Sequence, residues 1–145
     1  VTDVRNLGAI ARSAECAGVH ALIVPQQSTA PINQDAIRTS AGALLKIPVC
    51  RVANAKSLIN QVKSLGVKVY AATEKTENKY TGMQAAEPLM IIMGNEEKGI
   101  SSSLIKMADE LISIPVKGNI ESLNVSVAAG IILYEVVRQR ENIPK

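Results

Sequence analysis

Aromatic side chains are nearly absent from this sequence of 145 residues, which contains three Tyr, no Phe and no Trp. This scarcity excludes modules that read RNA by stacking bases on surface aromatics, and it also excludes aromatic-cage readers. Cysteine and histidine are equally sparse, because Cys16, Cys50 and His20 are the only ones and they form no ligand cluster. We therefore expect no metal site and interpret both cysteines as small buried hydrophobic residues in a reducing cytoplasm.

Long hydrophobic runs are missing as well. No segment approaches the roughly 20 apolar residues of a membrane helix, so we expect a soluble, cytoplasmic protein with no membrane partner. Neither sign of charge dominates, since 16 Lys and Arg oppose 13 Asp and Glu to give a net charge of +3. This mild basicity is compatible with a polyanionic partner but does not establish one. The hydrophobic fraction of 47% suffices for the core of one ordinary domain.

Apolar runs and helical patterns alternate along the whole chain. Runs typical of short buried strands occur at residues 21–24, 49–53, 67–72, 89–93 and 111–114. Residues with helical spacing lie before, between and after these runs. We expect a first helix capped by Asn6 and ended by Gly18, a short helix that ends near 43–44, and a last helix at about 123–140. This order predicts one α/β domain with a mostly parallel sheet and helices on both faces. Residues 89–93 are apolar at every position, so we expect a central strand there.

The glycine fingerprints of common nucleotide sites are absent. No GxGxxG occurs, and the loop at 94–99 is not a phosphate loop, because Lys98 precedes Gly99 and Ile100 follows it. This loop is either a glycine-tolerant turn with solvated charges or part of a ligand site. Because ligands of open α/β sheets bind outside the carboxyl ends of the strands, the loops that follow strands are the places to look.

Two further segments carry polar side chains beside predicted helix starts, at 3–12 and 114–126. Helix capping is the simplest interpretation of both. Asn124 indicates more than capping, because we expect it just inside an otherwise apolar helix, where Asn is unfavourable. Arg12 does so too, since a long side chain in the second turn leans toward the N-terminus and can reach back to the capped end.

Together these segments resemble the SpoU/TrmH family of RNA ribose 2′-O-methyltransferases, in the SPOUT superfamily. The three family motifs occur in order at residues 3–12, 92–99 and 114–126. Residues 39–43 and 47–52 look most like the bacterial 23S rRNA guanosine-2′-O-methyltransferase branch. The family usually has Pro where this sequence has Val4, a change that removes no reactive group.

The resemblance implies a C-terminal deep trefoil knot, a topology that no periodicity argument can reveal. It implies S-adenosyl-L-methionine as the cofactor, without a metal. The adenosine would be held by backbone groups of Gly94, Ile114 and Leu123, with Ala72 and Thr73 lining the far side. An RNA substrate, with a guanosine of 23S rRNA as the expected target, and a homodimer formed through the knot and the last helix are implied as well, and DNA is not an expected partner.

The catalytic residues that the resemblance carries over are Asn6, Arg12, Glu96, Ser122 and Asn124. A ribose 2′-hydroxyl reacts only when its proton is removed or its alkoxide is stabilised. The family assigns Arg12 as the general base, but a guanidinium with a pKa above about 12 is essentially never deprotonated, so Arg12 could instead stabilise the alkoxide and hold a phosphate. Glu96 is expected to pair with Arg12, Asn6 to orient Arg12 or the RNA, and Ser122 and Asn124 to order the third motif.

Three alternatives remain at this point: a tRNA 2′-O-methyltransferase of the same family, a non-catalytic knotted module that binds RNA or protein, and a different α/β nucleotide-binding enzyme. The intact Arg12, Glu96 and Asn124 argue against the non-catalytic module, and the missing fingerprints argue against the third alternative. We expect residues 1–145 to be a single catalytic domain, with an N-terminal RNA-binding domain and the first strand of the fold lying outside this chain.

Overall fold

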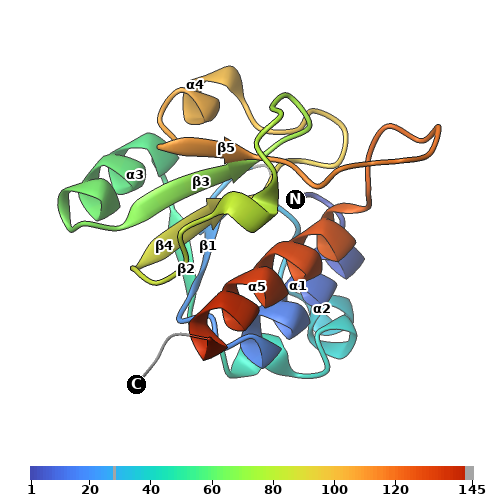
Figure 1. The fold of residues 1–145 in the computed structure, drawn as a ribbon. Helices are drawn as coiled ribbons and strands as arrows, with labels where there is room; N and C mark the ends of the chain where they lie inside the picture. Colours follow the sequence, from blue (N-terminus) through green and yellow to red (C-terminus); the bar gives the residue numbers. More distant parts are fainter. Residues whose placement is uncertain (28, 143–145) are drawn as a thin grey trace.

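The computed structural model describes residues 1–27 and 29–142, in which strands and helices alternate (Figure 1). The strands are β1 (Leu22–Pro25), β2 (Val49–Val52), β3 (Lys68–Ala72), β4 (Leu89–Ile92) and β5 (Glu110–Ile112). The α-helices are α1 (Val4–Cys16), α2 (Gln34–Thr39), α3 (Ala55–Ser64), α4 (Ser102–Ile105) and α5 (Val125–Glu141). Two 3-10 helices, η1 (Ala43–Leu45) and η2 (Tyr80–Gly82), complete the chain order. The five predicted strands are therefore confirmed.

The strands pair in parallel, as the alternation predicts. They form two hydrogen-bonded sets, β1–β2 and β4–β3–β5, rather than a single sheet. The prediction that residues 89–93 form the central strand is wrong, because β3 lies between β4 and β5. Val69, Tyr70 and Ala71 of β3 are fully buried, whereas every residue of β4 is half-buried. An unbroken apolar run predicts a strand, but it does not say which strand has two hydrogen-bonded neighbours.

The helices lie on both sides of the strands. Figure 1 shows α1, α2 and α5 packed together on one side and α3 and α4 on the other. Gly8 allows α1 to approach α2 closely, since a Cβ atom there would lie 2.7 Å from Cβ of Thr39. The single short helix expected to end near 43–44 is divided, because Ala41 and Gly42 adopt left-handed φ angles of 50° and 82° between α2 and η1.

The main core joins α5 to the three-stranded sheet. Tyr70, Ile112 and Ile132 are almost completely buried together, and the Tyr70 hydroxyl accepts a hydrogen bond from the Gln84 backbone N–H at 3.0 Å.

Cys16 and Cys50 are both exposed, so the prediction that they are buried is wrong. Cys16 ends α1, and Cys50 lies on the short, partly exposed β2, so neither position faces the core. Among the described residues, no helix is both long and apolar enough to cross a membrane.

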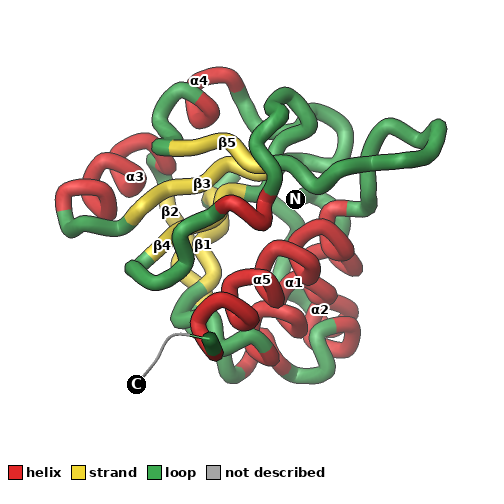
Figure 2. Tube along the Cα trace, viewed as in Figure 1, coloured by secondary structure: helices red, strands yellow, loops and turns green. Residues whose placement is uncertain are grey.

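The loops that follow β3, β4 and β5 gather at one end of the sheet (Figure 2). They do so because the three strands are parallel, which brings their carboxyl ends to a common edge. The first turns of α1 and α5 adjoin this end, where Asn124 and Asn6 contact one another. The fold therefore brings the three segments singled out in the sequence into one region.

Candidate active site

A cavity of about 1010 Å³ opens among these loops. Its walls come from the loops after β3, β4 and β5 and from the first turns of α1 and α5. All five predicted cofactor-binding residues line it: Ala72, Thr73, Gly94, Ile114 and Leu123. Four of the five predicted catalytic residues line it as well: Asn6, Glu96, Ser122 and Asn124.

Asp3, not Asn6, caps α1. One carboxylate oxygen of Asp3 accepts hydrogen bonds from the backbone N–H groups of Arg5 at 2.7 Å and Asn6 at 3.2 Å. The helix thus begins at Val4, before the predicted start, and the predicted capping role of Asn6 is wrong. Val4 occupies the first helical position, where proline is also tolerated because that N–H has no partner within the helix. Capping by Asp3 leaves the Asn6 side chain available for the site.

The Asn6 amide connects the other two motifs. Its Nδ2 donates to Oε1 of Glu96 at 3.1 Å, and its Oδ1 accepts from Nδ2 of Asn124 at 3.0 Å. An asparagine amide offers a donor and an acceptor on opposite branches, so one side chain can satisfy two different neighbours. Residues far apart in the sequence are therefore joined in one polar network beside the cavity.

Glu96 is held as an anion by four donors. Its carboxylate accepts from the Thr2 backbone N–H at 3.0 Å, the Thr2 hydroxyl at 3.2 Å, the Asp3 N–H at 3.2 Å and Asn6. Burial raises the pKa of Glu96, but the hydrogen bonds from Thr2, Asn6 and Asp3 outweigh it and lower the pKa to about 2. A carboxylate that is this acidic and this fully occupied is a poor proton acceptor near neutral pH.

Asn124 caps α5 and also joins the network. Its Oδ1 accepts from the Ser126 N–H at 2.9 Å, the Ser126 hydroxyl at 2.6 Å and the Val127 N–H at 3.4 Å. The prediction that Asn124 lies inside the helix is wrong, because α5 begins at Val125. The capping and site interpretations are therefore compatible, since Oδ1 serves the helix while Nδ2 binds Asn6.

The loop after β4 is a closed turn that borders the cavity. The backbone groups of Asn95 and Gly99 exchange two hydrogen bonds of 2.9 Å, and Oδ1 of Asn95 accepts from the N–H groups of Glu97 and Lys98. Gly94 is packed against this turn so closely that a Cβ atom would lie 2.8 Å from the carbonyl carbon of Gly99. The glycines here permit close backbone approach, and the loop is at once a tight turn and a cavity wall.

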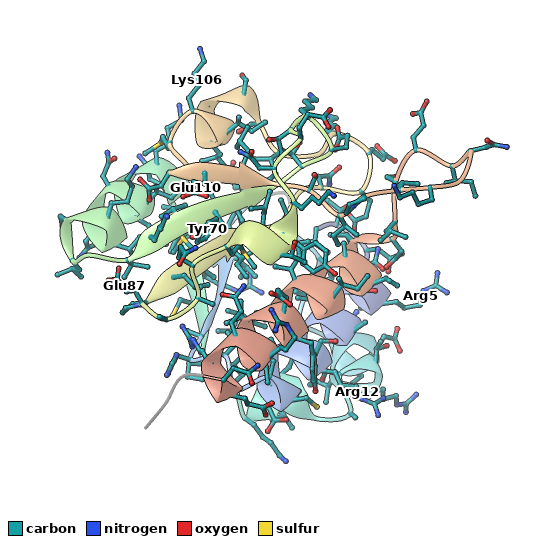
Figure 3. All side chains as sticks on the ribbon, in the orientation of Figure 1. Arg5, Arg12, Tyr70, Glu87, Lys106 and Glu110 are labelled. Atoms are coloured by element: carbon teal, nitrogen blue, oxygen red, sulfur yellow. The ribbon has the colours of Figure 1, made fainter. Side chains whose placement is uncertain are left out.

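Arg12 is the predicted site residue that lies outside the cavity. It is exposed on α1, six residues beyond Asn6, which corresponds to about 240° around the helix and about 9 Å along its axis. Figure 3 shows Arg12 on the side where α1, α2 and α5 pack, away from the loops at the strand ends. Within the described part of the chain, the predicted ion pair between Arg12 and Glu96 does not form, because Glu96 binds residues 2, 3 and 6 instead.

Two residues of the network were not identified from the sequence. Thr2 binds Glu96 through both its backbone and its side chain, and Asn95 donates through Nδ2 to the Thr2 hydroxyl at 3.3 Å. Asp3, by contrast, carried a readable signal, because Asp directly before an amphipathic run is typical of a helix N-cap. No such local signal marks Thr2 or Asn95, since their roles depend on contacts between distant segments.

A family model and several curated proteins match this chain over most of its length. The model of the SpoU rRNA Methylase family matches residues 1–134. The 23S rRNA (guanosine-2′-O-)-methyltransferase RlmB of Photorhabdus laumondii is 38% identical over 142 residues, which are 98% of this chain and 58% of that protein. The chain spans about half the length of the curated relatives it matches.

Solved structures of SpoU methyltransferases are similar to this chain as well. The SpoU methyltransferase AviRb from Streptomyces viridochromogenes, in complex with the cofactor AdoMet, matches with a TM-score of 0.90 and 31% identity, over 98% of this chain and 58% of that one. The A. aeolicus TrmH/SpoU tRNA modifying enzyme matches with a TM-score of 0.89 and 33% identity, over 97% and 72% of the two chains. The matched region includes all three segments that meet at the cavity, and the chain belongs to the SpoU rRNA methylase family.

Proposed function

We propose that this chain transfers a methyl group from S-adenosyl-L-methionine to a ribose 2′-hydroxyl of structured RNA, and that its target is a guanosine of 23S rRNA. The observation that carries the proposal is the meeting of five predicted cofactor residues and the Asn6–Glu96–Asn124 network at one cavity. Family membership and a related structure in complex with AdoMet support it.

The residues of the cavity fit this cofactor. Its volume is at the upper end of the roughly 300–1,000 Å³ typical of small-molecule sites. Ile114, Leu123 and Ile132 offer an apolar wall for a purine ring, while charged residues of both signs, Glu74 and Lys75 among them, suit the zwitterionic amino-acid end. When bound, S-adenosyl-L-methionine supplies a methyl group already activated by a sulfonium. Alignment of the attacking hydroxyl is therefore the main task of the protein.

The polar network performs that alignment. Asn6 and Asn124 fix one another beside the cavity, and Ser122 adds a hydroxyl on the third loop. Glu96 acts as a fixed anion that orients Asn6, because its oxygens are occupied and its pKa is about 2. The role of Glu96 is thus to position Asn6 rather than to accept the 2′-hydroxyl proton.

Arg12 contributes from a second copy of the chain. Within one chain, Arg12 and the cavity lie on different sides of α1. A symmetric dimer can present the exposed Arg12 of one copy to the cavity of the other. Leu123, Val127 and Tyr134 are 42%, 51% and 52% exposed on and beside α5, an apolar surface of the kind that a dimer covers. There the protonated guanidinium would stabilise the developing alkoxide and hold the neighbouring phosphate.

The C-terminal trefoil knot belongs to the same proposal. The TM-scores near 0.9 with SpoU structures support a shared chain path over almost the whole length. The choice of 23S rRNA is supported by the name of the RlmB relative. The A. aeolicus relative modifies tRNA, so tRNA is the second candidate substrate.

The direct test mixes the purified chain with methyl-labelled S-adenosyl-L-methionine and, separately, with 23S rRNA and tRNA transcripts. We expect cofactor binding, label at a 2′-O-methylguanosine of 23S rRNA, and loss of at least 99% of the transfer in Arg12→Lys, which keeps the charge but not the planar fork. Arg38→Lys, at an exposed arginine of α2, is the matched control and should transfer normally.

Three results would contradict the proposal in different places. A chain that does not bind the cofactor at high micromolar concentration rules out the methyltransferase. Label in tRNA instead of 23S rRNA overturns the substrate but keeps the chemistry. Normal transfer by Arg12→Lys refutes the role given to Arg12.

A further inference from the structure

We propose that Thr2 is a positioning residue for the methyl transfer, because its hydroxyl fastens the loop after β4 to the start of α1 and so fixes Glu96 against Asn6. This inference rests on the function proposed above and extends it to a residue outside the predicted catalytic set. Thr2 contributes no atom to the reaction, and its effect passes through Glu96.

Among the described residues, the Thr2 hydroxyl is the one side-chain group that forms hydrogen bonds with both Asn95 and Glu96. It lies 3.3 Å from Nδ2 of Asn95 and 3.2 Å from Oε2 of Glu96. Asn95 in turn closes the turn at 95–99 through its Oδ1. The hydroxyl therefore joins the residue that shapes this loop to the residue that orients Asn6.

The direction of these hydrogen bonds is determined by chemistry. The Asn95 Nδ2 is a donor only, so the Thr2 oxygen must accept from it. The ionised carboxylate of Glu96 is an acceptor only, so the single Thr2 proton must point toward Oε2. Asn95 and Glu96 together thus fix the Thr2 hydroxyl in one rotamer. The hydroxyl in turn fixes the position of Oε2 of Glu96.

The remaining donors hold the other half of the carboxylate. Oε1 of Glu96 accepts from the Asp3 N–H and from Asn6, whereas Oε2 depends on the N–H and the hydroxyl of Thr2. Removing the hydroxyl leaves Oε2 with one donor and lets the carboxylate rotate. Because Asn6 binds the other oxygen, that rotation displaces Asn6 from Asn124.

Thr2→Val tests this contact, since it keeps the β-branched shape and the backbone N–H but removes the hydroxyl. A carbon-13 NMR titration of the Glu96 carboxyl should show protonation beginning about half a unit to one unit higher in pH than in the wild type, because one donor to the anion is lost and water replaces part of it. At saturating cofactor, kcat for RNA should fall about tenfold, while the Kd for S-adenosyl-L-methionine changes by less than about twofold.

Thr2→Ser restores the hydroxyl and should return both readouts to wild-type values. Thr76→Val is the matched control, because within the described part of the chain the Thr76 hydroxyl has one hydrogen bond, from the Asn78 N–H in the loop after β3. It should change neither the Glu96 titration nor kcat.

An unchanged Glu96 titration in Thr2→Val overturns the inference, and so does a fall in kcat that Thr2→Ser fails to reverse. A wild-type chain that transfers no methyl group contradicts the proposed function instead. The NMR titration separates the two failures, because it reports on the Thr2 contact in the absence of RNA.

Discussion

Asn124 offers the sharpest test of how the site is built, because one side chain performs two separable tasks. Its oxygen caps the 17-residue helix α5, and its amide nitrogen donates to Asn6. Asn124→Ala removes both contacts. Asn124→Asp keeps two oxygens for the cap but replaces the donor with a second acceptor facing Oδ1 of Asn6.

The two substitutions should differ in stability. Losing an N-cap costs about 1 kcal/mol, and the exposed hydrogen bond to Asn6 adds about 0.5 kcal/mol, so Asn124→Ala should lose about 1.5 kcal/mol. For a domain of this size that corresponds to a fall of roughly 3–6 °C in Tm. Aspartate caps as well as asparagine and gains from the helix dipole, which offsets its repulsion from Asn6 and Glu96. Asn124→Asp should therefore stay within about 1 kcal/mol of the wild type.

The two substitutions should resemble each other in activity. Asn6 then has either no partner at residue 124 or an acceptor on both sides, and it is no longer held between Glu96 and residue 124. We expect methyl transfer to fall at least about tenfold in both variants. Thermal unfolding followed by circular dichroism and a single-turnover transfer assay measure the two effects separately.

Wild-type transfer by Asn124→Asp would refute the role of the Asn6–Asn124 contact. An unchanged Tm in Asn124→Ala would refute the capping role. Ser101→Ala is a useful reference, because Ser101 precedes α4 without a side-chain capping bond and should lose little stability.

Two further predictions concern the loop after β4 and the end of α5. Gly94→Ala should weaken cofactor binding at least about tenfold and lower the free energy of unfolding by about 1–3 kcal/mol, since the new Cβ meets the backbone of Gly99 and Ile100. Gly82→Ala is the control, because the space around Gly82 is open and both quantities should stay unchanged. Calorimetric titration and thermal melts measure the two effects. Glu135 accepts from Arg138 and Gln139, which lowers its pKa to about 2 from an ordinary 4.5. A shift of the pKa from 4.5 to about 2 corresponds to about 3 kcal/mol, which solvent screening of the exposed Arg138 reduces to about 2 kcal/mol. This contribution is present above pH 4.5 and is lost as the pH falls toward 2. Glu135→Gln should therefore be less stable at pH 7 and show a shallower decline of unfolding free energy over that interval, and an equal decline would contradict this.

The sequence alone was sufficient for features that depend on nearby residues. Periodicity predicted the five strands and the α/β class, because hydrophobic burial imposes a period on each element. The carboxyl ends of parallel strands meet at one edge, so the sequence also indicated which loops to inspect. The resemblance of the three motif segments to the SpoU/TrmH family then named residues of those loops that line the cavity.

Tertiary structure decided what depends on contacts between distant segments. Packing decides which strand is central, and the prediction of a central strand at 89–93 was wrong. The predicted cap of α1 at Asn6 was also wrong, because Asp3 caps that helix. Among the described residues Glu96 binds residues 2, 3 and 6 rather than Arg12, a set of contacts that no local pattern indicates. Thr2, Glu96 and Asn124 form hydrogen bonds with partners that are close only in the folded chain. A hydrogen bond depends on distance and direction within a few tenths of an ångström, and a linear pattern of residues contains neither.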